Sequence, residues 1–358
     1  MYDKRVSSLI NIIEQKDLDG VIITSRDNTM YLSSFSGTDS ILVFTRKKAY
    51  FATDFRYIET ASSLSAYGYE VVLIEEGVKS IVALLSKLFT SKGLRIGYEN
   101  TVPYGYFETL KQGLKDCVYY DISDQMLAIR SVKDETELSF MSKAAAIADI
   151  AFNHILKTVK IGMSEIEVAA ELEYVMKKNG ASFPAFDTIA VSGKKTSMPH
   201  GVPDSKKLMN HDTVTLDFGA NYKGYCSDMT RTFFIGSPSA EMIKIYNIVY
   251  KAQKEAQDYV KEGVSGFNAD KVARDIIEIE GYGNYFGHST GHGVGLLIHE
   301  EPRLSVKSKA VLKSNMTVTV EPGIYIPDLG GVRIENTVVV EKGGCYPLNH
   351  SNKEMIII

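Results

Sequence analysis

The chain of 358 residues is 44% hydrophobic and 23% charged, which is typical of an ordinary globular protein long enough for two domains. Its formal net charge is -4 and no run of lysine and arginine supplies a basic patch, so binding to nucleic acid is disfavoured. No apolar stretch approaches the roughly 18 residues needed to cross a bilayer, so we expect no membrane association.

The N-terminal residues and the cysteines bear on the cellular compartment. Residues 1–10 mix charged and apolar side chains at helical spacing and lack the apolar core of a signal peptide. The three cysteines are scattered and form neither a disulfide framework nor a C-x-x-C ligand pair. We therefore expect a cytoplasmic protein in a reducing compartment.

The first third of the chain alternates predicted helices and strands, the pattern of an α/β domain. We predict that this small domain spans residues 1–123. The pattern predicts helices at 6–15, near 30, at 78–88 and from Pro103 onward, and strands at 20–24, 41–45, 49–53, 71–75, 95–99 and 118–122.

Longer helices begin after residue 123. Asp134 can cap a helix that runs to about residue 157, and Ser164 with Glu167 forms a capping box for a second helix that ends at Gly180. Further helices at about 240–261 and 269–280 alternate with strand-rich segments. We therefore predict a second domain of mixed α and β structure over residues 124–358.

Two aspartates flank a predicted hairpin. The turn residues Asn221-Tyr-Lys-Gly224 suggest a turn centred between positions 222 and 223, a register in which Asp217 faces Asp228. Opposed side chains of an antiparallel pair have Cβ atoms about 4.5 to 5.5 Å apart, and like charges there repel unless a cation neutralises them. The alternative is that one aspartate ends its strand and points to water.

Two glutamates occupy β-branched segments that look buried. Glu321 follows Met316-Thr-Val-Thr-Val, and Glu335 lies in Gly331-Val-Arg-Ile-Glu-Asn-Thr-Val-Val-Val. Because glutamate rarely buries without a partner, a pairing of these strands would bring both carboxylates together, although the loop length leaves the register undecided. An ion pair of Glu335 with Arg333 is the weaker alternative, because it would lie in an apolar setting.

Three of the seven histidines, His288, His292 and His299, fall within twelve residues. Imidazole titrates near neutrality and is the commonest metal ligand, so the cluster suggests a metal site or a proton-transfer site. One imidazole together with the four carboxylates suits two divalent cations without residual charge. Two such ions can share a water, lower its pKa and polarise a carbonyl. The oxygen-rich ligand set favours manganese, with cobalt, zinc or iron as alternatives.

These residues resemble a known family, the metallopeptidases with the pita-bread fold, which includes Xaa-Pro dipeptidase (prolidase), aminopeptidase P and methionine aminopeptidase. The run HSTGHGVGLLIHE, residues 288–300, is similar to the signature of prolidase and aminopeptidase P. All five metal positions hold the residue type of the family, and the resemblance covers essentially the whole chain. It implies a creatinase-type domain over 1–123 and a pita-bread catalytic domain over 124–358.

The resemblance implies a role for each metal ligand. By this likeness Asp217 would bind one metal ion, His292 and Glu321 would bind the other, and Asp228 and Glu335 would bridge them. Glu321 would also serve as a proton shuttle. These roles rest on the likeness and not on spacing.

The same resemblance implies residues on the substrate side. His200, in Met-Pro-His-Gly, would join His288 and His299 in lining the substrate and stabilising the charged intermediate. Arg303 is similar to a prolidase residue that holds the carboxylate of the dipeptide, and Arg333 is a second candidate for substrate binding. A surface ion pair with a neighbouring glutamate would explain Arg303 equally well.

The expected function is that of a dinuclear metallo-exopeptidase. It would hydrolyse the Xaa-Pro bond at the N-terminus of dipeptides or short peptides, with a metal-bridging hydroxide attacking the carbonyl before proline. The N-terminal α/β domain favours prolidase and aminopeptidase P over methionine aminopeptidase, which is essentially the catalytic domain alone. A broader or methionine-type aminopeptidase is the alternative, and we expect a homodimer.

Two other functions compete with this one. Gly287-His-Ser289-Thr-Gly291 satisfies the G-x-S-x-G pattern of a serine hydrolase, and Asp328 and His350 follow in the required order. That motif needs a strand before the serine and a helix after it, whereas a poor helix start follows here. A metal-free binding module of the same fold would have lost ligands, and this chain has lost none.

Overall fold

The computed structural model describes residues 2–75 and 77–358. The chain forms two compact units, of which unit 1 ends at Arg130 and unit 2 begins at Ser131. The predicted boundary at 123/124 coincides with the start of α6 (Ser123–Ser131), a helix that groups almost wholly with unit 1. The two units are described separately below.

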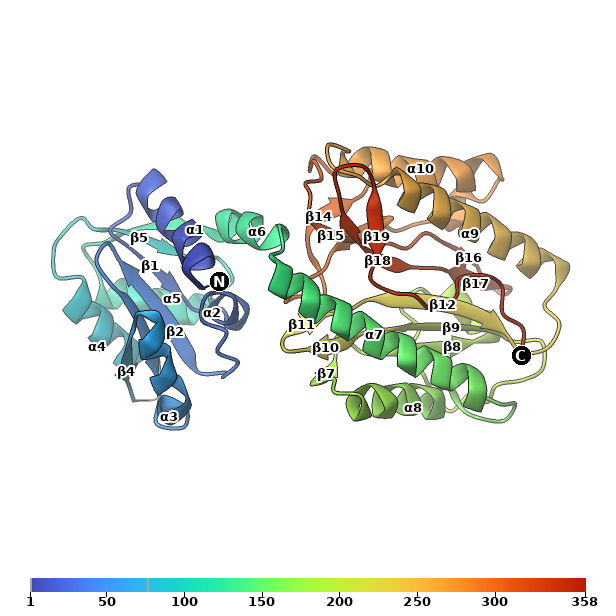
Figure 1. The fold of residues 1–358 in the computed structure, drawn as a ribbon, viewed down its shortest axis with the longest axis horizontal. Coiled ribbons are helices and arrows are strands. Elements are labelled where there is room, and N and C mark those ends of the chain that lie inside the picture. Colours follow the sequence, from blue (N-terminus) through green and yellow to red (C-terminus); the bar gives the residue numbers. More distant parts are fainter. Residues whose placement is uncertain (1, 76) are drawn as a thin grey trace. The chain divides into compact units, whose positions relative to one another are not determined.

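Unit 1 is built on one six-stranded sheet (Figure 1). Every strand except β2 runs in the same direction, because β2 pairs antiparallel with both of its neighbours. The order across the sheet is β4 (Tyr69–Leu73), β3 (Ala49–Thr53), β2 (Ser40–Thr45), β1 (Gly20–Ile23), β5 (Arg95–Tyr98) and β6 (Val118–Asp121).

The helices of unit 1 close the faces of this sheet. Ile22, Val43 and Ile96 are buried in one apolar cluster with residues of α4 and α5. The α/β character predicted for this part of the chain is therefore confirmed. Besides α6, the helices are α1 (Tyr2–Gln15), α2 (Arg26–Ser33), α3 (Ile58–Ala61), α4 (Val78–Leu88) and α5 (Tyr104–Gly113), with a 3-10 turn η1 (Ser62–Tyr67).

Unit 2 opens with the two helices whose caps the sequence predicts. Both capping boxes are present, since Asp134 accepts from the backbone of Glu137, and Ser164 accepts from that of Glu167. A glycine with φ of +104° at position 180 follows the second helix. The helices of this unit are α7 (Glu135–Thr158), α8 (Glu165–Lys178), α9 (Ala240–Tyr259) and α10 (Gly266–Ile279), with 3-10 turns η2 (Gly193–Ser197) and η3 (Gly283–Tyr285).

The strands of unit 2 form small antiparallel sheets between the two helix pairs (Figure 1). The first group contains β7 (Phe183–Pro184), β8 (Ile189–Ser192), β9 (Thr213–Phe218), β10 (Ala220–Tyr222), β11 (Tyr225–Cys226) and β12 (Met229–Phe234). The second contains β13 (Gly291–Gly293), β14 (Glu300–Leu304), β15 (Thr317–Val320), β16 (Gly323–Ile326), β17 (Gly330–Arg333), β18 (Asn336–Val340) and β19 (Cys345–Pro347).

Each helix pair packs on one group of strands. Phe152 of α7 and Leu172 of α8 share an apolar cluster with Leu216 of β9. Val249 of α9 and Ala273 of α10 share another with strands β15 to β18. The helices therefore cover the outer faces of the strands, and polar side chains are left to the inner faces, where the two groups meet.

The first long hairpin has a different register from the predicted one. Lys223 and Gly224, with φ of +50° and +88°, form its turn, so Tyr222 pairs with Tyr225 and Asp217 faces Thr230. The prediction that Asp217 faces Asp228 is therefore wrong by two positions. A shift of two keeps side chains on the same face, because strand side chains alternate with a period of two.

The second long hairpin has the register that the sequence left undecided. Val320 pairs with Asn336 on one side of a short break, and Gly323 pairs with Arg333 on the other. The same register carried across the break sets Glu321 opposite Glu335. The expectation that these strands bring the two glutamates together is confirmed.

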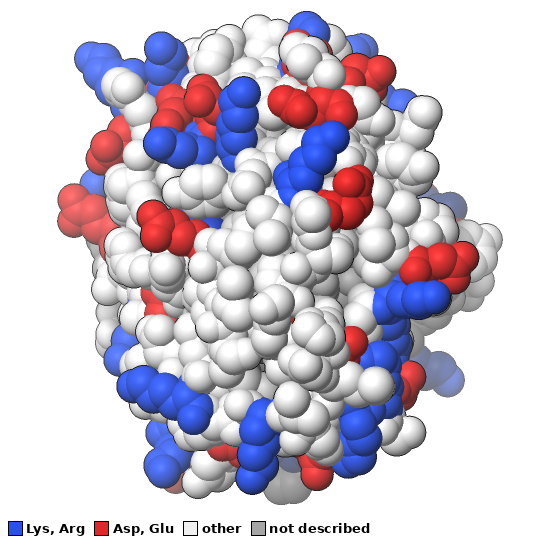
Figure 2. Space-filling model, turned by 90° about the vertical axis from the view of Figure 1, so that its right-hand side faces the viewer, with Lys and Arg blue, Asp and Glu red and all other residues white. Residues whose placement is uncertain are grey.

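The distribution of charged side chains on the surface agrees with the small net charge of the sequence. On the face drawn in Figure 2, basic and acidic side chains are interspersed around an uncharged centre, and neither sign forms a continuous patch. None of the helices in the described ranges has the length and apolar character that a bilayer span requires.

Candidate metal centre

The carboxylates lie where the two long hairpins of unit 2 stop pairing and meet each other. At the break of the second hairpin, the Glu321 N–H donates to the carbonyl of Thr290, and the Glu335 N–H donates to that of Thr230 on β12. The backbone thus joins the two hairpins beside the acidic side chains.

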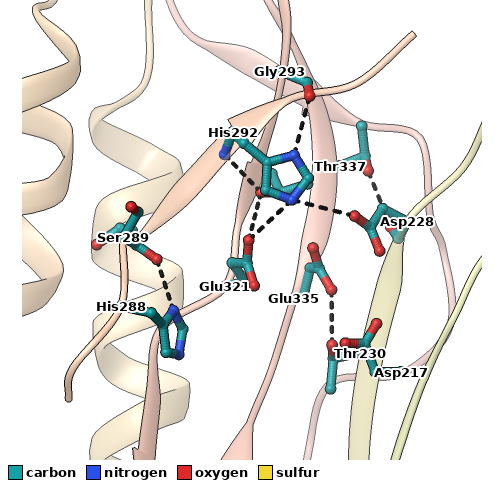
Figure 3. A network of polar contacts seen from close by, with 12 residues as sticks. Asp217, Asp228, Thr230, His288, Ser289, His292, Gly293, Glu321, Glu335 and Thr337 are labelled. Carbon is teal, nitrogen blue, oxygen red and sulfur yellow. Dashed lines mark hydrogen bonds and ion pairs between the residues drawn. The ribbon is translucent and has the colours of Figure 1, made fainter. Parts of the chain in front are cut away.

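Three buried groups converge in this region (Figure 3). One ligand atom each from Asp228, His292 and Glu335 lies within 4.8 Å of the others. His292 Nε2 is 3.5 Å from Asp228 Oδ2 and 3.3 Å from Glu321 Oε1. Four of the five predicted ligands are therefore close together, although they come from four separate segments of the chain.

The tautomer of His292 follows from its other ring nitrogen. Nδ1 lies 3.0 Å from the carbonyl oxygen of Gly293, to which it can only donate. In its neutral form His292 therefore has its Nε2 lone pair free for a metal ion on the side of Asp228 and Glu321, whereas a protonated Nε2 donates to Glu321. This is the arrangement of a histidine that binds a metal ion through Nε2.

Asp217, the fifth predicted ligand, joins the group through an arginine. Its Oδ2 lies 2.6 Å from Nη2 of Arg333, whose Nε donates to Thr230 Oγ1 at 3.0 Å. Thr230 donates in turn to Glu335 Oε2 at 2.7 Å. Thr230 thus connects the two hairpins twice, through its carbonyl and through its side chain.

Arg333, a predicted substrate-binding residue, is held by contacts within the protein. Its guanidinium is buried and donates to Asp217, to Thr230 and, at 2.8 Å, to the hydroxyl of Tyr325. Because these contacts are all within the protein, Arg333 positions Asp217. Arg333 also forms no ion pair with Glu335, which was the weaker alternative predicted from the sequence.

The electrostatics of the site are those of several carboxyl groups crowded together in a buried place. Burial raises the pKa of Asp228 and of Glu335 well above the usual range, and the neighbouring carboxylates raise both further. Burial also raises the pKa of Asp217, against the opposing effect of Arg333. Burial acts in the same direction on Glu321, but the hydrogen bond and charge of His292 outweigh it and lower the pKa of that residue.

Two oxygens provide a direct test of the fit to metal ions. Asp217 Oδ1 and Glu335 Oε1 are fully buried and have no hydrogen-bond partner within the described ranges. An unpaired buried carboxylate oxygen is costly unless it binds an ion. The donor set of carboxylate oxygens and one imidazole nitrogen suits Mn²⁺ and similar divalent ions, so these residues fit the expected metal site.

His288 lies on the far side of Glu321 from Asp228 (Figure 3). Its Nδ1 is 2.8 Å from the carbonyl of Ser289, and its Nε2 is 2.9 Å from the Tyr325 hydroxyl. When His288 is neutral and its Nδ1–H donates to Ser289, its Nε2 accepts the proton of the Tyr325 hydroxyl, whose oxygen accepts from Arg333. Both contacts require the same neutral tautomer, and burial lowers the pKa of His288.

The remaining predicted residues lie at the more open side of the site. The exposed His299 packs edge-on against His292, with ring centroids 4.4 Å apart, and its pKa is lowered chiefly by partial burial. The charge of His200 acts on both His288 and His299, which locates it nearby. Arg303 lies on β14 and acts on His299 in the same way. No ion pair between its guanidinium and a neighbouring glutamate is present among the described residues.

The structure removes the basis of the serine hydrolase alternative. Ser289 lies in a loop that leads into strand β13, and no helix follows it. The strand-turn-helix context of the nucleophile motif is therefore absent at this position.

Sequence reasoning missed the residues that hold the ligands. Thr319 Oγ1 donates to Glu321 Oε1 at 3.0 Å and accepts from the His292 N–H at 3.0 Å. Thr230 and Tyr325 were missed as well. Threonine and tyrosine are common in strands, so their presence indicates no role. Only the spacing of Thr230, two residues after Asp228 and therefore on the same face of the chain, could have indicated one.

The fold and this site define the chain as a metallopeptidase with an N-terminal accessory domain. Residues 139–342 match the model of metallopeptidase family M24, and residues 5–132 match that of the creatinase/prolidase N-terminal domain. Because the first match covers more than half of the chain, the protein belongs to metallopeptidase family M24.

Its relatives are similar along their whole length. The chain is 37% identical to the Xaa-Pro dipeptidase of Pyrococcus horikoshii, over 99% of both chains. Its structure matches that of a Xaa-Pro dipeptidase from Bacillus anthracis with a TM-score of 0.95 and 42% identity, over 100% of both chains. It also matches an X-Pro aminopeptidase from Thermotoga maritima with a TM-score of 0.88 and 35% identity, over 96% of this chain and 98% of the other.

Proposed function

We propose that this protein is a dinuclear metallo-exopeptidase that hydrolyses the Xaa-Pro bond at the N-terminus of dipeptides or short peptides. The observation that carries the proposal is the convergence of Asp228, His292 and Glu335 within 4.8 Å, with a buried and unpaired oxygen on Glu335. The names of the relatives, which are Xaa-Pro dipeptidases and an X-Pro aminopeptidase, support the substrate class.

The five candidate ligands divide between two ions. We propose that Asp217 binds one ion, that His292 and Glu321 bind the other, and that Asp228 and Glu335 bridge them. The orphaned oxygens of Asp217 and Glu335 support these assignments. When bound, the ions would polarise the scissile carbonyl and lower the pKa of a water molecule.

The side chains around the ions hold protons and orient the peptide. Glu321, whose pKa is lowered, is ionised at neutral pH and would accept a proton from the attacking water. His200 and His299 would stabilise negative charge on the substrate oxygen. His288 would line the substrate together with them, and the Tyr325 hydroxyl that faces its Nε2 would hold its ring in place.

The proposal also covers Arg303, the identity of the metal, the oligomeric state and the domains. Arg303 would bind the carboxylate of a dipeptide, which its lack of an ion-pair partner in the described part of the chain supports. Manganese is the proposed metal, with cobalt, zinc or iron as alternatives, and the protein would act as a cytoplasmic homodimer. Residues 1–123 and 124–358 would be the functional domains.

One set of assays tests the function. With Mn²⁺ added, the protein should cleave Ala-Pro, and a chelator should abolish this activity. Asp228→Ala should lose both bound metal and hydrolysis while circular dichroism shows a folded protein, and Ser289→Ala should stay active. Full activity of Asp228→Ala would overturn the dinuclear mechanism. Comparison with Ala-Pro-Ala distinguishes a dipeptidase from an aminopeptidase.

A further inference from the structure

We infer that Lys133, a buried lysine just before α7, is a positioning residue for the loop that carries His299. Its side chain is 1% exposed, and Nζ lies 3.4 Å from Oε2 of Glu300, whose side chain is 3% exposed. Glu300 directly follows His299 in the sequence. The inference rests on the proposed function, in which His299 faces the substrate.

The segment around Lys133 is itself held by the strand that leads to Glu321. Val132 forms an isolated bridge with Met316, and the Lys133 N–H donates to the carbonyl of Asn315 at 2.9 Å. Met316 directly precedes β15, at whose end Glu321 lies. The backbone of Lys133 is therefore hydrogen-bonded to the segment that leads into β15, the strand that precedes Glu321.

The loop of residues 294–299 folds around the Glu300 carboxylate. Glu300 Oε1 accepts from the Leu297 N–H at 3.0 Å. The backbone at Gly295 packs so closely on this carboxylate that an added Cβ would lie 2.6 Å from Oε2. The carboxylate at the centre of the loop organises its backbone, and the ammonium group of Lys133 lies 3.4 Å from Oε2 of this carboxylate.

The same loop is tied to the strand that leads to Asp228. The N–H of Cys226, on β11, donates to the carbonyl of Gly295 at 2.8 Å. The neighbouring Tyr225 donates its hydroxyl proton to Glu137, in the first turn of α7, at 3.0 Å. Hydrogen bonds thus connect the start of α7 to β11 and β11 to the loop. His299, at the end of the loop, packs against His292.

Stability alone is a weak reason for such an ion pair. Replacing a buried ion pair by apolar residues of similar size is often neutral or stabilising, whereas removing one partner is strongly destabilising. The geometry of the loop, by contrast, depends on the carboxylate, because Leu297 and Gly295 are arranged around it. Lys133 and Glu300 are 167 residues apart in sequence, so the pair fixes the loop to a distant segment.

The test combines kinetics with hydrogen exchange. In Lys133→Met, the kcat for Ala-Pro should fall by roughly 10- to 100-fold, because a misplacement of about 1 Å has effects of that size. KM should change by less than about threefold. The amides of residues 294–299 should exchange faster while those of β15 and β18 keep their rates, and Lys133→Arg should restore most of kcat.

The double variant Lys133→Met/Glu300→Leu separates positioning from stability. It should regain the Tm lost in Lys133→Met but not the kcat. Lys206→Met is the matched control, since it breaks a partly buried ion pair with Asp212 (2.9 Å) at the opposite end of β9 from Asp217. It should lower Tm and leave kcat unchanged.

Three results would overturn the inference: wild-type kcat in the folded Lys133→Met protein, a double variant that recovers kcat together with Tm, or faster exchange spread evenly over unit 2. Failure of the proposed function is distinguishable, because the unsubstituted protein would then not cleave Ala-Pro. The exchange measurement needs no substrate and tests the loop in either case.

Discussion

Tyr325 links the metal centre to the histidine on its far side. Its hydroxyl accepts from Arg333, which also holds Asp217, and donates to His288. Burial raises the pKa of Tyr325 to about 12, so the hydroxyl stays protonated at neutral pH and has a proton to donate to a neutral His288. One side chain therefore orients both a ligand-holding arginine and a candidate catalytic histidine.

Replacing Tyr325 by Phe tests this link. The variant leaves an Arg333 N–H and His288 Nε2 without a partner, which should reduce stability by about 1–3 kcal/mol. We expect kcat for Ala-Pro to fall by roughly tenfold or more, with metal content unchanged. Tyr346→Phe, on β19 and partly exposed, is the control. An unchanged kcat in Tyr325→Phe would show that His288 needs no such orientation.

The raised pKa values of Asp228 and Glu335 predict proton release on metal binding. A carboxyl whose pKa is raised holds its proton at pH values above about 4, where a free carboxyl has already lost it. A bound cation favours the charged form, so Mn²⁺ should displace protons and bind more tightly as pH rises. Calorimetry in buffers of different ionisation enthalpy measures the protons released.

The matched variant for this measurement is Asp228→Asn, which removes one titrating group. It should release fewer protons per bound ion, as well as binding more weakly. Proton-neutral binding by the unsubstituted protein at pH 6 would show that the carboxylates are already ionised without metal.

The residue types at the site were predictable, but the residues that hold them were not. Asp217, Asp228, Glu321 and Glu335 stand out because acids are unusual in buried strands. Thr230 carries no such signal, because its role depends on a contact with Glu335 across 105 residues of sequence. Contacts of that kind become visible only when the two hairpins are placed together.

At the scale of elements, the hairpin turns position the ligands. A two-residue turn with positive φ at both central positions fits the right-handed twist of the strands, and Gly224 takes the second position readily. The sequence contains the turn residues, but Asn221 to Gly224 can be aligned with the turn in two ways. The predicted alignment was wrong, whereas the helices that start at Asp134 and Ser164 were predicted correctly because capping is local.

Gly219 offers a test of how the first hairpin brings the aspartates together. A Cβ at this position would lie 1.8 Å from the carbonyl oxygen of Ser227, the residue before Asp228. Gly219→Ala should therefore separate the two arms, lower Tm by several degrees and weaken Mn²⁺ binding by at least tenfold. Gly343→Ala, where nothing lies within 4 Å, should change neither. Normal metal affinity in Gly219→Ala would mean that the arms adjust without moving the ligands.

At the scale of the whole molecule, every candidate site residue lies in unit 2. The apolar clusters that bury Leu216 and Val249 are also formed entirely by residues of this unit. The division into two domains was predictable because the helix and strand pattern changes near residue 123. How a peptide is selected by length was not, because that depends on surfaces that a pattern of local elements does not describe.

Unit 2 expressed alone, as residues 131–358, should fold and bind Mn²⁺ with an affinity within about tenfold of the full chain. The reason is that its ligands and both of its cores are complete within this range. Thermal unfolding with and without Mn²⁺ measures this. A fragment that shows no cooperative transition would indicate that unit 1 is needed for folding.

The break in the second hairpin has a consequence for the metal-free protein. The backbone N–H groups of Glu321 and Glu335 donate to Thr290 and Thr230 instead of to each other's strands. The two arms therefore lack a mutual backbone hydrogen bond at the level of the carboxylates. Cations bound there would act as that missing cross-link, joining β13, the end of β15, β9 with Asp217, and Asp228 just before β12. We therefore expect removal of the ions to loosen this part of the sheet.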